Sequence, residues 1–246
     1  VFMDYKKSIL LNAFVEYVRS VLSMVEQDFS YESVFRFLRT GFTEFTRDEI
    51  DRLENYVVAV GLRGYKKWQA VWARKTSSAD EEELAVLNGL RVRFVEMTES
   101  LVFVLKQRKK TVRDICEAVY RFFVENQIQE KLKVMENCFA EKKELALAKE
   151  YAQIYRIVLE LFDKFAELLG DEGISLKEYC ELLDAGLEEA KVGVIPPGMD
   201  QVVIGDVQRT RLKSNLKALF FVGANDTLLP GNMGQGGLLT ERDREW

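Results

Sequence analysis

Residues 127–169 read QIQEKLKVMENCFAEKKELALAKEYAQIYRIVLELFDKFAELL, a stretch that contains neither glycine nor proline. Apolar side chains recur in it at intervals of three and four residues, which places them on one face of a helix. This apolar stripe comprises Ile128, Leu132, Met135, Phe139, Tyr151, Ile154, Val158, Phe162, Phe165 and Leu169. The pattern predicts one long helix, or two helices that break near residues 141–150. Additional apolar positions widen the stripe, which favours packing inside a helix bundle over a coiled coil.

Glycine and proline divide the rest of the chain into two parts. Residues 1–190 contain 7 glycines and no proline, whereas residues 191–246 contain the other 8 glycines and all 3 prolines. Both residue types disrupt the helical hydrogen-bond ladder. We therefore predict a mainly α protein, with a multi-helix bundle domain over residues 1–190 and a small α/β segment over residues 191–246.

Capping signals predict where several helices begin and where one ends. Three Ser/Thr residues are followed three positions later by an acid that can complete a capping box. These pairs are Thr46 with Glu49, Thr111 with Asp114, and Ser175 with Glu178. Gly61 stands where a left-handed residue is expected to end the first of these helices.

The last part of the chain has short apolar runs between turn residues. Residues 201–205 and 218–223 are strand candidates, because continuous apolar runs that end in glycine are typical of buried strands. Two strands do not form a stable sheet alone. We therefore expect this tail to need sheet partners from a longer protein.

Composition excludes several kinds of chemistry. The chain has no histidine, which removes Ser-His and Cys-His nucleophiles and histidine-bound zinc. Its 3 cysteines, Cys116, Cys138 and Cys180, are far apart, so a cysteine metal site is not expected, and their number fits a reducing cytoplasm. No phosphate-binding loop motif occurs. No uncharged apolar run approaches the roughly 18 residues that span a membrane.

Charge is segregated although the net charge is only −5. Residues 61–79, 106–113 and 207–225 carry basic side chains and no acid, whereas residues 114–190 hold 9 basic and 18 acidic residues. Aromatic side chains interleave the first basic stretch, and such surfaces contact phosphates and stack on bases. In the alternative interpretation, Trp68 and Trp72 are core residues four positions apart and the lysines form a solvated rim.

Two sets of motifs suggest a family. The first set comprises YESVFRFLRTG at residues 31–41, DEIDRLENYV at residues 48–57 and GLRG at residues 61–64. The second set comprises MDQVVIGD at residues 199–206, RTR at residues 209–211, FVGAND at residues 221–226, Pro230, and GLLTERDREW at residues 237–246. Together they resemble the central part of AddB, the B subunit of bacterial AddAB-type ATP-dependent helicase–nucleases.

The resemblance implies a place for each part of the chain. Residues 1–190 would be a helical domain of the helicase 2B type, inserted into the second RecA-like domain. Residues 191–246 would be a two-stranded part of that RecA-like (2A-like) domain. The loop at residues 206–211 lacks the Lys-Gly pair of superfamily-1 helicases, so no ATP-driven motor is expected here. ATP, Mg and an iron–sulfur cluster are implied for the whole subunit and not for this segment.

The resulting hypothesis is a non-catalytic scaffold segment of a cytoplasmic enzyme that processes double-strand breaks for recombinational repair. The resemblance implies an AddA-like subunit and DNA as partners. The candidate DNA contacts are Arg63, Lys66, Lys67, Trp68, Arg209 and Arg211. The alternative is a helical protein–protein interaction module without DNA contact. Convergence of the basic stretches on one face would favour DNA.

Overall fold

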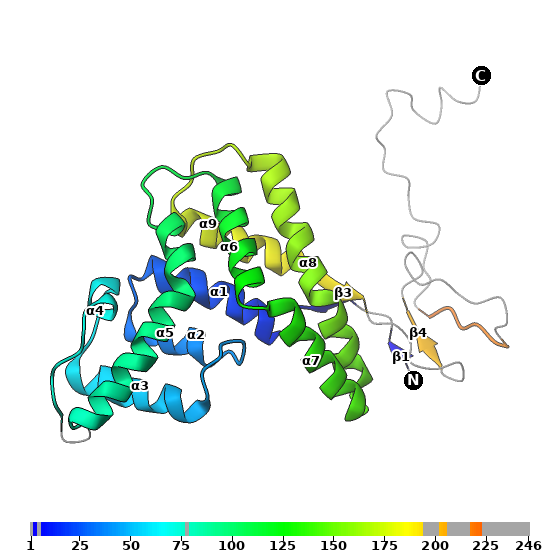
Figure 1. Ribbon diagram of the computed structural model, residues 1–246. Coiled ribbons are helices and arrows are strands. Elements are labelled where there is room, and N and C mark those ends of the chain that lie inside the picture. The colour runs from blue at the N-terminus through cyan, green and yellow to red at the C-terminus, as the bar shows by residue number, and fades with distance from the viewer. Residues whose placement is uncertain (1, 4–5, 77–78, 194–201, 206–216, 223–246) are drawn as a thin grey trace. The chain divides into compact units, whose positions relative to one another are not determined.

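The computed structural model describes residues 2–3, 6–76, 79–193, 202–205 and 217–222, and these residues are mainly helical. In chain order (Figure 1) the helices are α1 (Ala13–Glu26), α2 (Tyr31–Leu38), α3 (Arg47–Val60), α4 (Tyr65–Gln69), α5 (Glu81–Leu105), α6 (Val112–Glu125), α7 (Ile128–Glu141), α8 (Leu145–Leu169) and α9 (Leu176–Glu189). The short strands are β1 (Phe2–Met3), β2 (Lys6–Ser8), β3 (Lys191–Gly193) and β4 (Val203–Ile204). The mainly α fold class is thus confirmed.

The chain divides into two compact units, one over residues 1–204 and one over residues 205–246. All the helices and strands named above belong to the first unit. The sequence-based boundary between residues 190 and 191, with a helicase 2B-like domain before it and a 2A-like segment after it, stays a prediction.

Side-chain caps begin three helices at the residues that the sequence indicates. In α3, α6 and α9 the capping hydroxyl accepts from the backbone N–H three residues on, and the acid there accepts from the cap's own N–H. The pairs are Thr46 with Glu49, Thr111 with Asp114, and Ser175 with Glu178. Gly61 ends α3 with a left-handed φ of 69°. These contacts satisfy backbone groups that a helix end leaves without partners.

The long stretch at residues 127–169 forms two helices rather than one. α7 and α8 meet at a short turn in which Lys143 has a φ of 61°. The backbone N–H of Glu144 donates to the Phe139 carbonyl oxygen at 2.9 Å, which closes the turn. Phe139 and Tyr151 then face each other across the pair, with ring centroids 5.1 Å apart. The apolar stripe of each helix is therefore buried inside the bundle, partly by the other helix.

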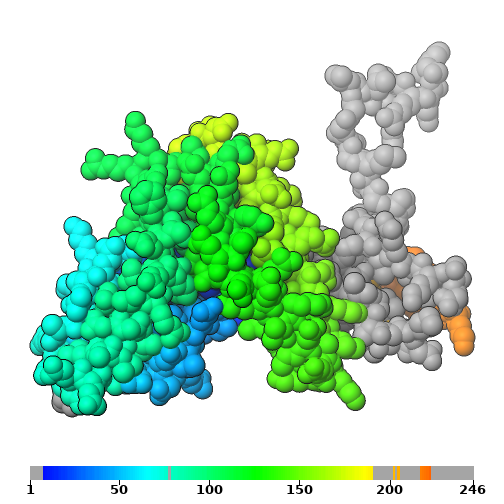
Figure 2. All heavy atoms as spheres, in the orientation of Figure 1, coloured from blue at the N-terminus to red at the C-terminus, as the bar shows by residue number. Residues whose placement is uncertain are grey.

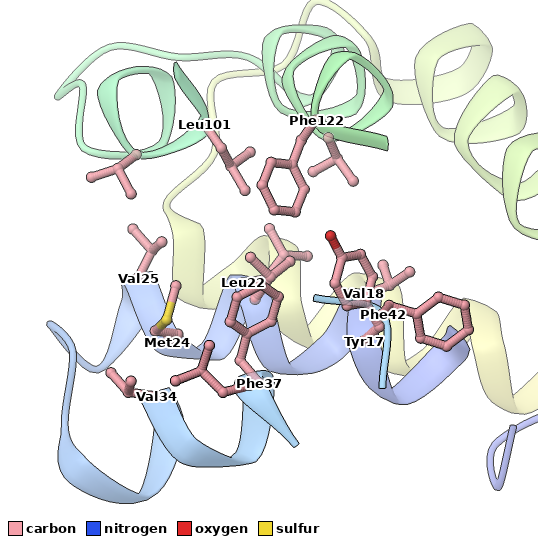
Figure 3. Packing of buried hydrophobic residues seen from close by; sticks show 14 of the residues in the cluster. Tyr17, Val18, Leu22, Met24, Val25, Val34, Phe37, Phe42, Leu101 and Phe122 are labelled. Atoms are coloured by element: carbon pink, nitrogen blue, oxygen red, sulfur yellow. The ribbon is translucent and has the colours of Figure 1, made fainter. Parts of the chain in front are cut away.

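The core is built around α1. Figure 3 shows Tyr17 and Leu22 on α1 pointing into the interior that Phe37 and Phe122 also enter. The Tyr17 ring centroid is 5.2 Å from that of Phe37 on α2 and 5.9 Å from that of Phe122 on α6. Such aromatic pairs stabilise a core beyond the area that they bury. The buried Tyr17 hydroxyl has no hydrogen-bond partner among the described residues, and burial raises the pKa of Tyr17 well above its usual value.

Two short strand pairs join segments that are far apart in the sequence. β2 pairs antiparallel with β3, which sets Lys6 opposite Gly193 and Ser8 opposite Lys191. β1 pairs parallel with β4, and β4 lies within the strand predicted at residues 201–205. The strand predicted at residues 218–223 is wrong for its described part, because residues 218–222 form no strand. A strand needs a hydrogen-bonded neighbour, and nothing in the described residues supplies one there.

Candidate nucleic-acid interface

Asp28, just after α1, joins the first two basic stretches. Its Oδ1 accepts a hydrogen bond from Lys106 Nζ at 2.5 Å, and the Tyr65 backbone N–H points at the same oxygen from 3.5 Å. The Lys106 ammonium also lies over the Tyr65 ring, 5.1 Å from its centroid. The Lys106 hydrogen bond holds the pKa of the Asp28 carboxyl below its usual value, and the charge of nearby Lys66 contributes. The start of α4 and the end of α5 therefore meet at one carboxylate.

The backbone at this junction is unusual. Asp28 and Phe29 both have left-handed φ angles, of 45° and 58°, which is costly for a bulky residue such as phenylalanine. Burial of Phe29 against Tyr65, at a centroid distance of 4.7 Å, helps to offset that cost. Gly64, with a φ of 89°, begins α4, and a Cβ there would lie 3.1 Å from Asp28 Oδ2. Glycine at 64 thus lets the loop before α4 approach the carboxylate closely.

Six exposed cations surround this junction, and we call them the α4–α5 basic surface. They are Arg63, Lys66, Lys67, Lys106, Arg108 and Lys109. Apart from the Lys106–Asp28 pair, none of the six forms an ion pair with another described residue. Figure 2 shows the face on which both α4 (cyan) and the loop after α5 (green) are visible. Two of the three basic stretches therefore contribute to one surface.

The remaining cations of these two stretches lie next to acids. Lys75 pairs with Glu81 at 3.0 Å. The backbone of Lys110 and Val112 is hydrogen-bonded to the loop between α8 and α9, and Arg113 Nε lies 3.7 Å from Asp171 Oδ1 in that loop. The basic surface therefore covers the early part of each stretch and not its whole length.

A buried arginine fixes α4 to α5. Arg91, 6% exposed, donates through Nη1 to the carbonyl oxygens of Trp68 and Gln69 at 2.9 and 3.2 Å. Its Nε donates to Asn88 Oδ1, and Asn88 Nδ2 donates to the Trp72 carbonyl oxygen at 2.9 Å. Burial lowers the pKa of the Arg91 guanidinium. We call Arg91, Asn88 and the backbone of residues 68–72 the Arg91 cluster. Its cation lies at the C-terminal end of α4, where the helix dipole is negative.

The sequence-predicted contact residues have different outcomes. Arg63, Lys66 and Lys67 are exposed on the α4–α5 basic surface. Trp68 is 1% exposed and packs on Phe94 with centroids 4.6 Å apart, so this conformation leaves no ring face for a base. Its position agrees with the alternative interpretation as a core residue. Arg209 and Arg211 lie outside the described residues.

Two residues that organise the surface were missed from the sequence. Asp28 has no motif, and its role depends on a contact with Lys106, 78 residues away. Arg91 looks like an ordinary surface arginine in a long helix. Only the packing of α4 against α5 reveals that it is buried. A glycine in GLRG that must accept a positive φ was the one available signal for a close approach here.

Metal ions and membranes find no obvious binding feature. Within the described ranges, no three potential ligands among Cys, Asp and Glu come together as a metal site. None of the described helices combines the length and the apolar character needed to cross a bilayer.

Comparison with known proteins identifies the class of protein to which this segment is related. No protein-family model matches the chain. Curated proteins do match it over nearly its full length, and they are components of ATP-dependent helicase/deoxyribonucleases.

Specifically, the relatives are the B subunits of these enzymes. The protein from Lachnoclostridium phytofermentans is 44% identical over 247 residues, which cover 99% of this chain and 21% of the relative. The protein from Clostridium novyi is 36% identical, with 99% of this chain and 21% of the relative covered. The chain is therefore homologous to a segment of these proteins, and the resemblance to AddB is confirmed. It spans about a fifth of their length.

Proposed function

We propose that this chain is a non-catalytic scaffold segment of a helicase–nuclease B subunit and that its α4–α5 basic surface contacts the phosphate backbone of DNA. The observation that carries the proposal is the meeting of two basic stretches at Asp28. Lys106 bonds Asp28, and Tyr65 and Lys66 of the first stretch adjoin the same carboxylate. Exposed lysines and arginines without carboxylate partners are the groups that phosphates attract.

The wider setting belongs to the same proposal. The names of the relatives support a whole subunit that acts with ATP and Mg, carries an iron–sulfur cluster elsewhere in its chain, and pairs with an AddA-like subunit. Processing of double-strand DNA breaks in the cytoplasm would be the task of that complex. Residues 191–246 would complete a RecA-like α/β domain together with segments of the longer protein.

Binding of DNA by the 246-residue chain tests the proposal. Fluorescence anisotropy would follow labelled single-stranded and duplex oligonucleotides at about 50 mM and about 150 mM NaCl. If four cations of the surface contact phosphates of a single strand, log K falls with log salt with a slope of about −3. Threefold more salt would then weaken binding about 20-fold.

A matched pair of charge reversals locates the contact. Lys66→Glu with Lys67→Glu should weaken binding about 10-fold or more and reduce the salt slope by about 1. Lys164→Glu with Lys177→Glu changes the net charge equally, at exposed lysines of α8 and α9, and should have little effect. Absence of binding at low salt, or equal loss in both double variants, would overturn the assignment of this surface.

A protein-binding role remains the second candidate, and a specific observation favours it. Tyr120 and Val124 lie one turn apart on α6 and are 49% and 56% exposed. Acids predominate over residues 114–190. This part of the bundle is suited to a protein partner such as the AddA-like subunit. Substitution of both side chains by alanine should weaken assembly with that partner in a pull-down while leaving DNA binding intact.

A further inference from the structure

Phe103 is an aromatic side chain that the fold leaves in water. It lies near the end of α5 and is 71% exposed, although its neighbours Val102 and Leu105 are both 2% exposed. Lys106 follows three residues later, so the two side chains are neighbours along the helix. An exposed aromatic ring therefore stands beside the α4–α5 basic surface.

The surroundings of Phe103 are polar. Glu99 and Gln107 lie one turn away on either side along the helix, and both are exposed. A single ring in such surroundings does not make the broad apolar patch that marks a protein-docking site. Base stacking needs only one ring face with cations beside it to hold the backbone.

We propose that Phe103 stacks on a base of a single DNA strand whose phosphates contact the α4–α5 basic surface. The inference rests on the proposed function, because the cations of that surface would bring the backbone to the ring. It adds a preference for single strands, since duplex bases are already stacked and paired. Lys106, held by Asp28, lies on the side of Phe103 toward the basic surface. Glu99 repels phosphates on the other side, so the strand would run from Phe103 toward the loop after α5.

The tryptophans of the first basic stretch do not compete for this role. Trp68 and Trp72 are 1% and 5% exposed. Both are part of the core contact between α4 and α5, where Trp72 Nε1 donates to the Lys67 carbonyl oxygen at 3.0 Å. In the helical unit, the large exposed aromatics of the described residues are Phe103 and Tyr120.

An oligonucleotide without bases separates stacking from phosphate binding. The 246-residue chain would be titrated with a labelled oligothymidylate and with an abasic oligomer of the same length. Phe103→Ala should weaken binding to oligothymidylate about 5-fold or more and leave binding to the abasic oligomer unchanged. Phe103→Trp should keep the affinity, and its fluorescence should fall on binding oligothymidylate but not on binding the abasic oligomer. Tyr120→Ala is the matched control and should change neither affinity.

The outcomes distinguish this inference from the proposed function. Equal affinities of Phe103→Ala and the wild-type chain for oligothymidylate would overturn stacking, while salt-sensitive binding of both oligomers would leave the proposed function standing. An equal loss on both oligomers would also overturn stacking, because the ring would then act through the backbone contacts. If the wild-type chain binds neither oligomer at low salt, the proposed function itself is wrong. Unfolding midpoints equal to that of the wild-type chain would verify that the variants are folded.

Discussion

Replacement of Arg91 by methionine should detach α4 from α5. Methionine approximates the length of the arginine stem but has no hydrogen-bond donor. In the structure, Arg91 Nη1 is the donor to two carbonyl oxygens, those of Trp68 and Gln69. Asn88 would also lose the donor that faces its Oδ1. The substitution therefore removes the cation of the Arg91 cluster and keeps most of its volume.

The expected cost follows from the groups that are left without partners. A buried carbonyl that loses its donor costs about 1–3 kcal/mol, and hydrogen bonds from a charged donor lie at the upper end of the range. The Trp68 carbonyl is buried, whereas the Gln69 carbonyl is only partly so. Relief from burying a guanidinium offsets some of the loss. We expect the free energy of unfolding to fall by about 2–4 kcal/mol.

Tryptophan fluorescence during urea unfolding is the assay, since Trp68 and Trp72 are both at the contact between α4 and α5. Arg121→Met is the control, because Arg121 is exposed and pairs with no acid among the described residues. It should change stability by about 0.5 kcal/mol or less. If Arg91→Met and Arg121→Met unfold at the same urea concentration with the same slope, the Arg91 cluster does not hold α4 in place.

Three further predictions concern the core, a helix cap and the thiols. Tyr17→Phe should stabilise the chain by about 1 kcal/mol, because the buried hydroxyl has no partner among the described residues. Tyr56→Phe should destabilise it by a similar amount, because Tyr56 OH donates to the Arg74 carbonyl oxygen at 2.9 Å; thermal unfolding of both variants checks the opposite signs. Thr46→Ala should lower the stability by about 1 kcal/mol in the same assay, since it removes the cap of α3, and an unchanged midpoint would contradict the role of the cap. At pH 8 a thiol reagent should modify exposed Cys138 first, because burial raises the pKa of Cys180 to about 12 and keeps that thiol protonated; the rate at Cys180 should still rise with pH above 8, and mass spectrometry of partly labelled chain would reveal any other order.

Local signals in the sequence predicted local structure well. The capping boxes at Thr46, Thr111 and Ser175 each begin a helix, because the signal and the contact lie within four residues of each other. The break between α7 and α8 was predicted only as an alternative, since Lys143 adopts a left-handed φ without glycine at that position. The strand at residues 218–223 was overpredicted because an apolar run specifies burial and not the partner that a strand needs.

The candidate surface was predicted only in part, for a physical reason. The two basic stretches were visible as composition, but their meeting depends on Asp28 and Lys106, which are distant in sequence. Trp68 was nominated for stacking although its spacing from Trp72 equally fitted the core. Charge and aromatic content therefore identified the surface, and burial decided which side chains are available on it.

The pairing of β2 with β3 has a mechanical consequence. Both connections between the bundle and the segments beyond this ladder pass through three residue pairs, and the outermost is Lys6 with Gly193. A pull on these two outer ends would load that pair first, then Lys7 with Val192, and then Ser8 with Lys191. The ladder would peel like a zipper, one pair at a time, and resist less force than strands sheared along their length. Under tension, the bundle would therefore loosen at its attachment while its aromatic core stayed folded.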